Sequence, residues 1–178
     1  MKLLLIGLMT LSMSIPSNAQ EPIIFSEVVP VEGVSKEELY NRAKIWFTTS
    51  YNSANDVLQM DDKENGQIIG KAVITYNSSL YNASEHFDGS INYTIKVLIK
   101  DGRYKYEISN FIHRAYGRGS FGLITTQDPS PLIKGFTKKY CNKVWLEIKN
   151  QINEEVGSLI KSLKTGTSQQ SDIKNDDW

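Results

Sequence analysis

Four residues near the end of a predicted strand carry side chains suited to binding an anion. They are His113, Arg114, Tyr116 and Arg118, which place an imidazole, two guanidinium groups and a phenol close together in the chain. Arginine can hold a carboxylate or a phosphate through two parallel hydrogen bonds. We predict that these residues bind a ligand; the alternative is a solvated loop whose arginines lie over the sheet.

The same stretch contains the glycine pattern G-x-G-x-x-G at residues 117–122. A dinucleotide site needs a helix that opens directly on this pattern and an acidic residue about 20 positions later. Here the sequence Leu-Ile-Thr-Thr follows at 123–126, and the next predicted helix begins only near Pro131. We interpret residues 117–122 as a flexible loop and predict no cofactor.

The remaining reactive residues do not predict a reaction. His86, Asp88 and His113 could together ligate a metal, but no tight spacing joins them, so we predict no metal site. The chain lacks the nucleophile motif G-x-S-x-G and has only two histidines to act as a base. Cys141, the only cysteine, lies in an apolar helical stripe, where we expect a buried and inert thiol. We predict no catalytic residues.

The first nineteen residues have the layout of a secretory signal peptide. Lys2 precedes an apolar run over 3–13, Pro16 follows it, and the small residues Ser17 and Ala19 suit a cleavage site. The run is shorter than the roughly 20 apolar residues that span a membrane. We predict an exported protein of the periplasm or the cell surface, with no transmembrane segment after cleavage. The alternatives are an uncleaved anchor and a buried first strand.

The rest of the chain has the length and charge of one neutral domain. The sequence has 20 basic and 20 acidic residues, whereas nucleic-acid-binding proteins usually show a basic excess. We therefore predict no nucleic-acid partner. We expect residues 20–164 to form a single domain and the polar residues 165–178 to form a disordered tail.

Hydrophobic periodicity predicts a strand and then a helix at the start of this domain. The strand covers 23–31. Ser35 and Glu38 match a capping box, in which each side chain accepts from the other residue's backbone amide. The helix that they begin is expected to end near Ser50.

A meander of strands should follow. Alternation and turn residues predict the strands 57–60, 67–76, 87–99 and 103–113. Asn-Gly and Asp-Gly pairs mark two of the tight turns. Asp61 and Asp62 fall at the tip of the first hairpin, where we expect both carboxylates to be solvated.

A long C-terminal helix is predicted from about Pro131 to Lys164. Its apolar stripe is clear from Cys141 onward, at spacings of three and four residues. Gly157 suggests close packing or a bend in this helix, and Gly166 suggests a stop. The resulting order, β-α-β-β-β-β-α, is typical of an α+β domain in which both helices pack on one face of an antiparallel sheet.

Several segments resemble a family of exported proteins of unknown function that is frequent in Bacteroidota. They are Phe-Ser-Glu-Val-Val-Pro-Val-Glu-Gly at 25–33, the helix start at 35–40, and Lys-Asp-Gly-Arg-Tyr-Lys at 100–105. The resemblance covers roughly residues 24–115. It implies a TATA-binding-protein-like fold, with a helix-grip-like packing of the long helix, and it carries no assigned reaction or catalytic residues. The comparison concerns backbone topology, which does not transmit function.

Three hypotheses on function follow. The first is a non-enzymatic binding or envelope-structural domain that contacts an unknown envelope protein through the open sheet face or the loop 113–122. The second is a carrier of a small apolar ligand between the sheet and the C-terminal helix, where the aromatic residues of the meander gather. The third is a hydrolase that uses the loop 113–122.

Overall fold

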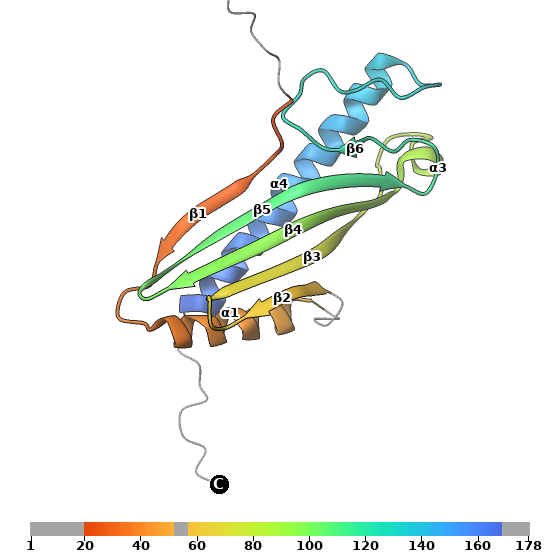
Figure 1. The fold of residues 1–178 in the computed structure, drawn as a ribbon. Coiled ribbons are helices and arrows are strands. Elements are labelled where there is room, and N and C mark those ends of the chain that lie inside the picture. The colour runs from red at the N-terminus through yellow and green to blue at the C-terminus, as the bar shows by residue number, and fades with distance from the viewer. Residues whose placement is uncertain (1–19, 52–56, 169–178) are drawn as a thin grey trace, which may run out of the picture.

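The computed structural model describes residues 20–51 and 57–168, so the predicted signal peptide and residues 169–178 of the predicted tail lie outside the described residues. The strands are β1 (Phe25–Pro30), β2 (Leu58–Asp62), β3 (Gln67–Tyr76), β4 (Gly89–Lys100), β5 (Arg103–Ala115) and β6 (Gly122–Leu123). The helices are α1 (Lys36–Ser50), α3 (Ser84–Phe87) and α4 (Lys138–Ser168). Figure 1 shows their arrangement.

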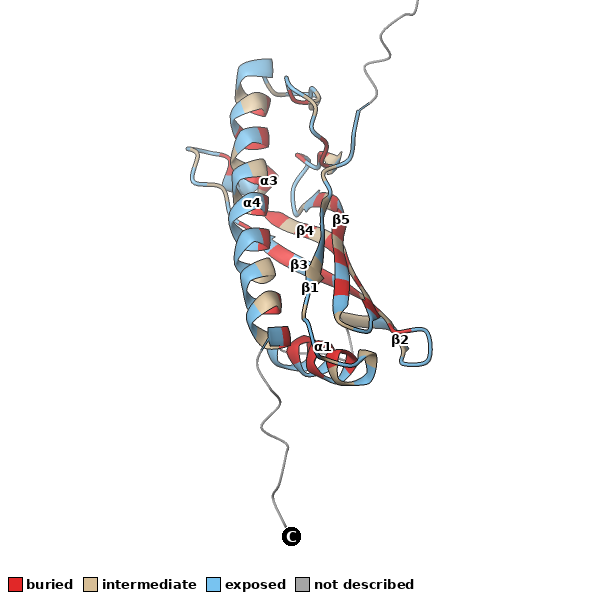
Figure 2. Ribbon diagram, turned by 90° about the vertical axis from the view of Figure 1, so that its left-hand side faces the viewer, coloured by how far each residue is buried: buried red, intermediate tan, exposed pale blue. Residues whose placement is uncertain are grey.

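The strands form one antiparallel sheet in the order β1-β5-β4-β3-β2, and β6 pairs with the far end of β5. Both long helices lie on the same face of this sheet, as the turned view in Figure 2 shows. The predicted α+β architecture is therefore confirmed. The short elements α3 and β6 are additions that the sequence analysis did not predict.

The core lies between the sheet and the two helices. Strand β4 alternates strictly, with Ile91, Tyr93, Ile95, Val97 and Ile99 buried, as its period of two predicted. The helices contribute a matching set of buried side chains: Leu39, Trp46, Phe47, Cys141, Val144, Ile148, Ile152 and Val156. The predicted burial of the thiol of Cys141 is confirmed.

Helix α1 begins with one of the two hydrogen bonds of the predicted capping box. Ser35 Oγ accepts a hydrogen bond from the backbone N–H of Glu38 at 3.3 Å. The carboxylate of Glu38 also accepts from Arg42 Nε at 2.8 Å, one turn further along the helix. This side chain therefore ties two turns of α1 together.

Asp61 is exposed, as predicted, but it does not lie at the hairpin tip. Asp61 lies within β2, on the sheet face that α1 covers, where its carboxylate accepts from Tyr40 Oη and pairs with Lys44 Nζ at 2.7 Å. The hydrogen bonds from Lys44 and then from Tyr40 lower the pKa of the Asp61 carboxyl. Asp62, in contrast, accepts from the backbone N–H of Asn65 at 2.9 Å and shapes the turn.

Helix α4 starts later and ends later than predicted. It begins at Lys138 rather than near residue 131, and Thr137 Oγ1 accepts from the N–H of Tyr140 at 3.3 Å in its first turn. The helix continues through Gly166, where a Cβ would lie 3.1 Å from Trp46 Cδ1, so this glycine allows α4 to pack closely against α1. Thr167 is buried and donates to Tyr104 Oη at 3.0 Å, so the residues 165–168 belong to the domain and not to a tail.

One of the two expected reasons for Gly157, close packing, is contradicted. A Cβ built on this residue meets no atom within 4 Å among the described residues, so close packing does not require glycine at this position of α4.

A bulge in β5 changes which side chains face the core. Between β4 and β5 the pairing shifts from Thr94↔Ser109 to Asn92↔Ile112, so β5 has one extra residue in this interval. Asn110 takes up the extra residue with a φ of 60°, a left-handed conformation that asparagine tolerates better than most residues. The alternation is therefore reversed beyond it: Tyr104, Tyr106 and Ile108 face the core before the bulge, and Phe111 and His113 face it afterwards.

Candidate functional site

His113 is a core residue and not part of an exposed loop. Its side chain is 0% exposed, and its Nδ1 accepts from the backbone N–H of Phe121 at 3.3 Å. The ring proton therefore resides on Nε2, which donates to the carbonyl oxygen of Phe87 at 2.9 Å. Burial lowers the pKa of the His113 imidazole, against the opposing effect of the bond to Phe87. Through these two bonds the neutral ring of His113 connects β5 to Phe87 of α3 and to Phe121, the residue before β6.

The other three predicted ligand residues do not join it. Arg114 is exposed on the opposite face of β5, and Tyr116 is 80% exposed. The guanidinium of Arg118 lies over the ring of Phe136, 5.3 Å from the ring centre, in a cation–π contact. These four side chains point in different directions, so His113, Arg114 and Arg118 do not converge on a pocket as a hydrolase at the loop 113–122 would require.

The glycine pattern serves close packing against α3. A Cβ on Gly117 would lie 2.5 Å from the carbonyl oxygen of Glu85, and one on Gly119 would lie 2.5 Å from Phe87 Cδ1. The backbone N–H of Gly119 donates to the carbonyl of His86 at 2.9 Å. Residues 117–121 therefore form a loop, as predicted, and two of its glycines allow this loop to pack against α3.

His86 and Asp88 also differ from their predicted setting on a strand. His86 lies in α3 and its ring contacts that of Phe136, while Asp88 follows α3 and accepts from the backbone N–H of Ser78 at 2.7 Å. Within the described ranges 20–51 and 57–168, no three His, Cys, Asp or Glu side chains are placed to hold a metal ion.

Glu147 on α4 accepts hydrogen bonds from the last residue of β3 and from the loop that follows it. Its carboxylate accepts from Tyr76 Oη at 2.7 Å, from the backbone N–H of Ser79 at 2.8 Å, and from the hydroxyls of Ser78 and Ser79. Burial by itself raises the pKa of the Glu147 carboxyl, but the bonds from Ser78, Ser79 and Tyr76 outweigh it and lower the pKa. All of these partners are neutral donors, so the cluster anchors the loop to α4.

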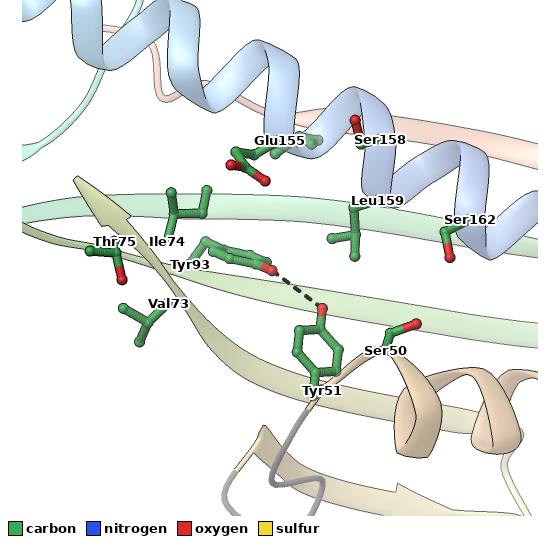
Figure 3. A pocket seen from close by; sticks show the side chains of 11 residues that line it. Ser50, Tyr51, Val73, Ile74, Thr75, Tyr93, Glu155, Ser158, Leu159 and Ser162 are labelled. Atoms are coloured by element: carbon green, nitrogen blue, oxygen red, sulfur yellow. Dashed lines mark hydrogen bonds between the residues drawn. The ribbon is translucent and has the colours of Figure 1, made fainter. Parts of the chain in front are cut away.

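A groove between the sheet and α4 is the best candidate for a ligand site. It has a volume of about 520 Å³ and runs along β3 beneath the last turns of α4, beside the end of α1 (Figure 3). Its apolar surface comes from Val73, Ile74, Tyr93, Val156 and Leu159. Its polar groups come from Ser50, Tyr51, Thr75, Glu155, Ser158 and Ser162.

Two tyrosines meet within the groove. The hydroxyl of Tyr51, at the end of α1, lies 3.3 Å from the hydroxyl of Tyr93 on β4. Figure 3 shows the two rings pointing toward one another below Leu159 and Glu155. Burial raises the pKa of both phenols, so both stay protonated at neutral pH. A hydroxyl can donate once and accept twice, so the pair keeps capacity for further hydrogen bonds.

Only part of this groove had a signal in the sequence. Glu155, Ser158, Leu159 and Ser162 are spaced by three and four residues and so share one face of a helix. That face mixes apolar and polar side chains, whereas the neighbouring stripe of α4 that begins at Cys141 is apolar. Tyr51, which follows α1, had no such signal, because only the tertiary fold brings it to Tyr93.

Comparisons with known proteins identify the fold. Residues 25–114 match the family described as a domain of unknown function (DUF4468) with TBP-like fold, which confirms the resemblance noted at residues 24–115. None of the curated proteins matches the sequence.

Two crystal structures share the fold. A TBP-like protein from Parabacteroides distasonis superposes with a TM-score of 0.53 and 19% identity, over 84% of this chain and 95% of that one. A DUF4468 family protein from Bacteroides ovatus has a TM-score of 0.52 and 15% identity, over 84% of this chain and 89% of that one. Neither description indicates a reaction. In the part of the chain that the structure describes, no helix is long and apolar enough to cross a membrane.

Proposed function

We propose, from the premise that this chain belongs to the DUF4468 family of domains with a TBP-like fold, that it is a non-enzymatic binding domain. Its ligand is a small amphipathic molecule, held in the groove between the sheet and α4. The observation that carries the proposal is this groove, with its apolar floor and the hydroxyl pair of Tyr51 and Tyr93.

The size and lining of the groove support such a ligand. Sites for small molecules usually measure about 300–1,000 Å³ and combine an apolar lining with a few polar groups, and this groove, at about 520 Å³, fits that range. An apolar body would lie against Ile74, Val156 and Leu159. A hydroxyl or amide on the ligand would bond to the tyrosine pair, whose protonated phenols carry no charge that would repel it.

An uncharged fluorescent probe tests the site directly. We expect N-phenyl-1-naphthylamine, an apolar molecule with one N–H donor, to bind saturably and to increase in emission on leaving water. Leu159→Arg should weaken this binding at least tenfold, because it places a cation and a longer side chain in the groove. Leu146→Arg is the matched control, since Leu146 is an exposed leucine of α4 outside the groove.

Two results would reject the groove as the site. One is no saturable binding of the probe together with a native mass spectrum of the purified protein that shows no additional bound mass. The other is equal affinity in wild type and Leu159→Arg, provided that the variant melts at a temperature close to that of the wild type.

We also propose that the domain acts outside the cytoplasm, in the periplasm or at the cell surface. The support is the signal-peptide layout of residues 1–19. The mass of the protein recovered from the envelope fraction should correspond to a chain that begins at Gln20 or Glu21. Material that retains Met1 would contradict this.

A further inference from the structure

Among the described residues, no helix covers the face of the sheet opposite α1 and α4. Figure 1 views the molecule from this side, with α4 behind the strands. Pairing registers show which side chains it presents, because directly opposite residues point to the same side of a sheet. Lys96 is opposite Glu107 and Ile69, and Lys105 is opposite Val28 and Leu98. We refer to this surface, formed by the outward residues of β1 to β5, as the open face.

The open face is basic although the whole chain is neutral. Its cationic side chains are Lys71, Lys96, Lys100, Arg103, Lys105 and Arg114. Its carboxylates are those of Asp62 and Glu107. The sequence gives no sign of this excess, because the positive charges lie on three different strands and are balanced by acidic residues in the total charge.

Among the described residues, no ion pair uses these cations. The ion pairs among the described residues join Glu38 to Arg42, Asp61 to Lys44, Glu37 to Lys63 and Glu27 to Lys164. None of these four ion pairs includes a cation of the open face. Lys100 and Arg103 are directly opposite each other in the β4–β5 hairpin, a like-charge pair that is unfavourable unless an anion lies near it. The open face therefore has positive charge available for a partner.

Exposed aliphatic side chains lie among the charges. Val28 is 54% exposed and Met60 45%, and each points outward in the register of the sheet. The aromatic residues of β3 to β5, in contrast, face the core: Tyr76, Tyr93, Tyr104, Tyr106 and Phe111. Proteins that bind single-stranded nucleic acid use aromatic side chains as stacking platforms, and these strands offer none on the open face.

We propose that the open face docks onto a lipid bilayer that carries anionic headgroups. Neighbouring strands lie about 4.8 Å apart and alternate residues about 6.8 Å apart, so the cations of β3, β4 and β5 form a two-dimensional array and not a single row. Such an array matches the surface of a membrane better than a linear polymer. Basic residues are attracted to anionic headgroups, and exposed aliphatic groups add contact with the interface. This inference is independent of the groove, which lies on the side of α4.

Vesicle co-sedimentation of the full chain tests the proposal. Residues 1–19 contribute equally to wild type and variants, so the comparison between variants isolates the open face. We expect stronger binding to vesicles with about one third phosphatidylglycerol than to pure phosphatidylcholine, and a decrease as salt is raised. Lys96→Glu with Lys105→Glu should weaken binding to the anionic vesicles at least tenfold.

The matched control is Lys134→Glu with Lys139→Glu, which reverses two exposed lysines away from the open face. This control should bind as the wild type does, and circular dichroism should show that both double variants are folded. An equal loss of vesicle binding in the two double variants would overturn the proposal. The same holds if the wild type shows no preference for anionic vesicles. Binding to heparin or duplex DNA without binding to vesicles would also overturn it, in favour of a linear polyanion. Leu159→Arg should leave vesicle binding unchanged, which separates this test from that of the groove.

Discussion

Replacing His113 by leucine removes a side chain that satisfies two buried backbone groups at once. The imidazole accepts from the N–H of Phe121 and donates to the carbonyl of Phe87, and it is fully buried. Leucine fills much of the same space but can make neither bond. The variant therefore tests whether the residue holds the core together, as the structure indicates, or serves an exposed ligand site.

The expected cost follows from the two groups left without a partner. An unsatisfied buried donor or acceptor costs about 1–3 kcal/mol. The bond from Phe121, at 3.3 Å, is long and should count at the low end, so we expect His113→Leu to lower the free energy of unfolding by about 2–4 kcal/mol. A domain of this kind has only about 5–15 kcal/mol in total. His113→Gln should cost less, because its amide can still donate to Phe87.

The pH dependence provides a second measure of the same residue. An unfolded histidine has a pKa near 6.5, and burial lowers the pKa of His113 in the folded state. As the pH falls below about 6.5, the unfolded chain takes up a proton that the folded chain does not. The contribution of His113 to the free energy of unfolding is therefore constant above that pH. Below it, this contribution falls by up to about 1.4 kcal/mol per pH unit.

Urea unfolding between about pH 7.5 and pH 5.5 measures both effects, because carboxylates with a lowered pKa lose their contribution mainly at more acidic pH. We expect wild type to lose stability toward the acidic end, and His113→Leu and His113→Gln to lose less. The argument fails if His113→Leu is as stable as wild type at about pH 7.5. It also fails if His113→Gln keeps the full pH dependence of wild type.

Two further predictions concern α4. Glu147→Gln should destabilise the domain by about 1–3 kcal/mol in urea unfolding, because the hydroxyl and amide donors of the loop after β3 lose a charged acceptor; an unchanged midpoint would show that this anchor contributes nothing. Gly157→Ala should raise the free energy of unfolding by about 0.5–1 kcal/mol, because alanine favours a helix and its Cβ meets no atom within 4 Å. A lower melting temperature in that variant would mean that an unrecognised contact forms at residue 157.

Local patterns were sufficient to predict most elements of the fold. Alternation along residues 91–99 identified β4 and its buried face, and the stripe that begins at Cys141 identified the buried face of α4. Ser35 marked the start of α1, and the turns at Gly66 and Gly102, with φ of 65° and 69°, lie where Asn-Gly and Asp-Gly pairs predicted them. These signals are readable because each depends on residues only a few positions apart.

Local patterns led to wrong predictions where contacts with another helix or strand determine the position of a side chain or the end of a helix. Strict alternation places His113 on the same side of β5 as Lys105, but the bulge at Asn110 turns it into the core. Asp61 is held by Tyr40 and Lys44 of α1, and the helix extends past Gly166 because Trp46 packs against it. For Asp61 and Gly166 the deciding side chain is distant in sequence, and the bulge at Asn110 shows only in the pairing of β5 with β4.

The sequence alone determined the class of fold, the family and the neutral total charge. The tertiary structure decided where a ligand could bind, since the groove joins residues of α1, β3, β4 and α4, and the open face gathers lysines and arginines from three strands. The physical reason is that the period of a helix or strand is set by the backbone, and so can be read from near neighbours. A binding surface depends on register and packing, which arise only when distant segments meet.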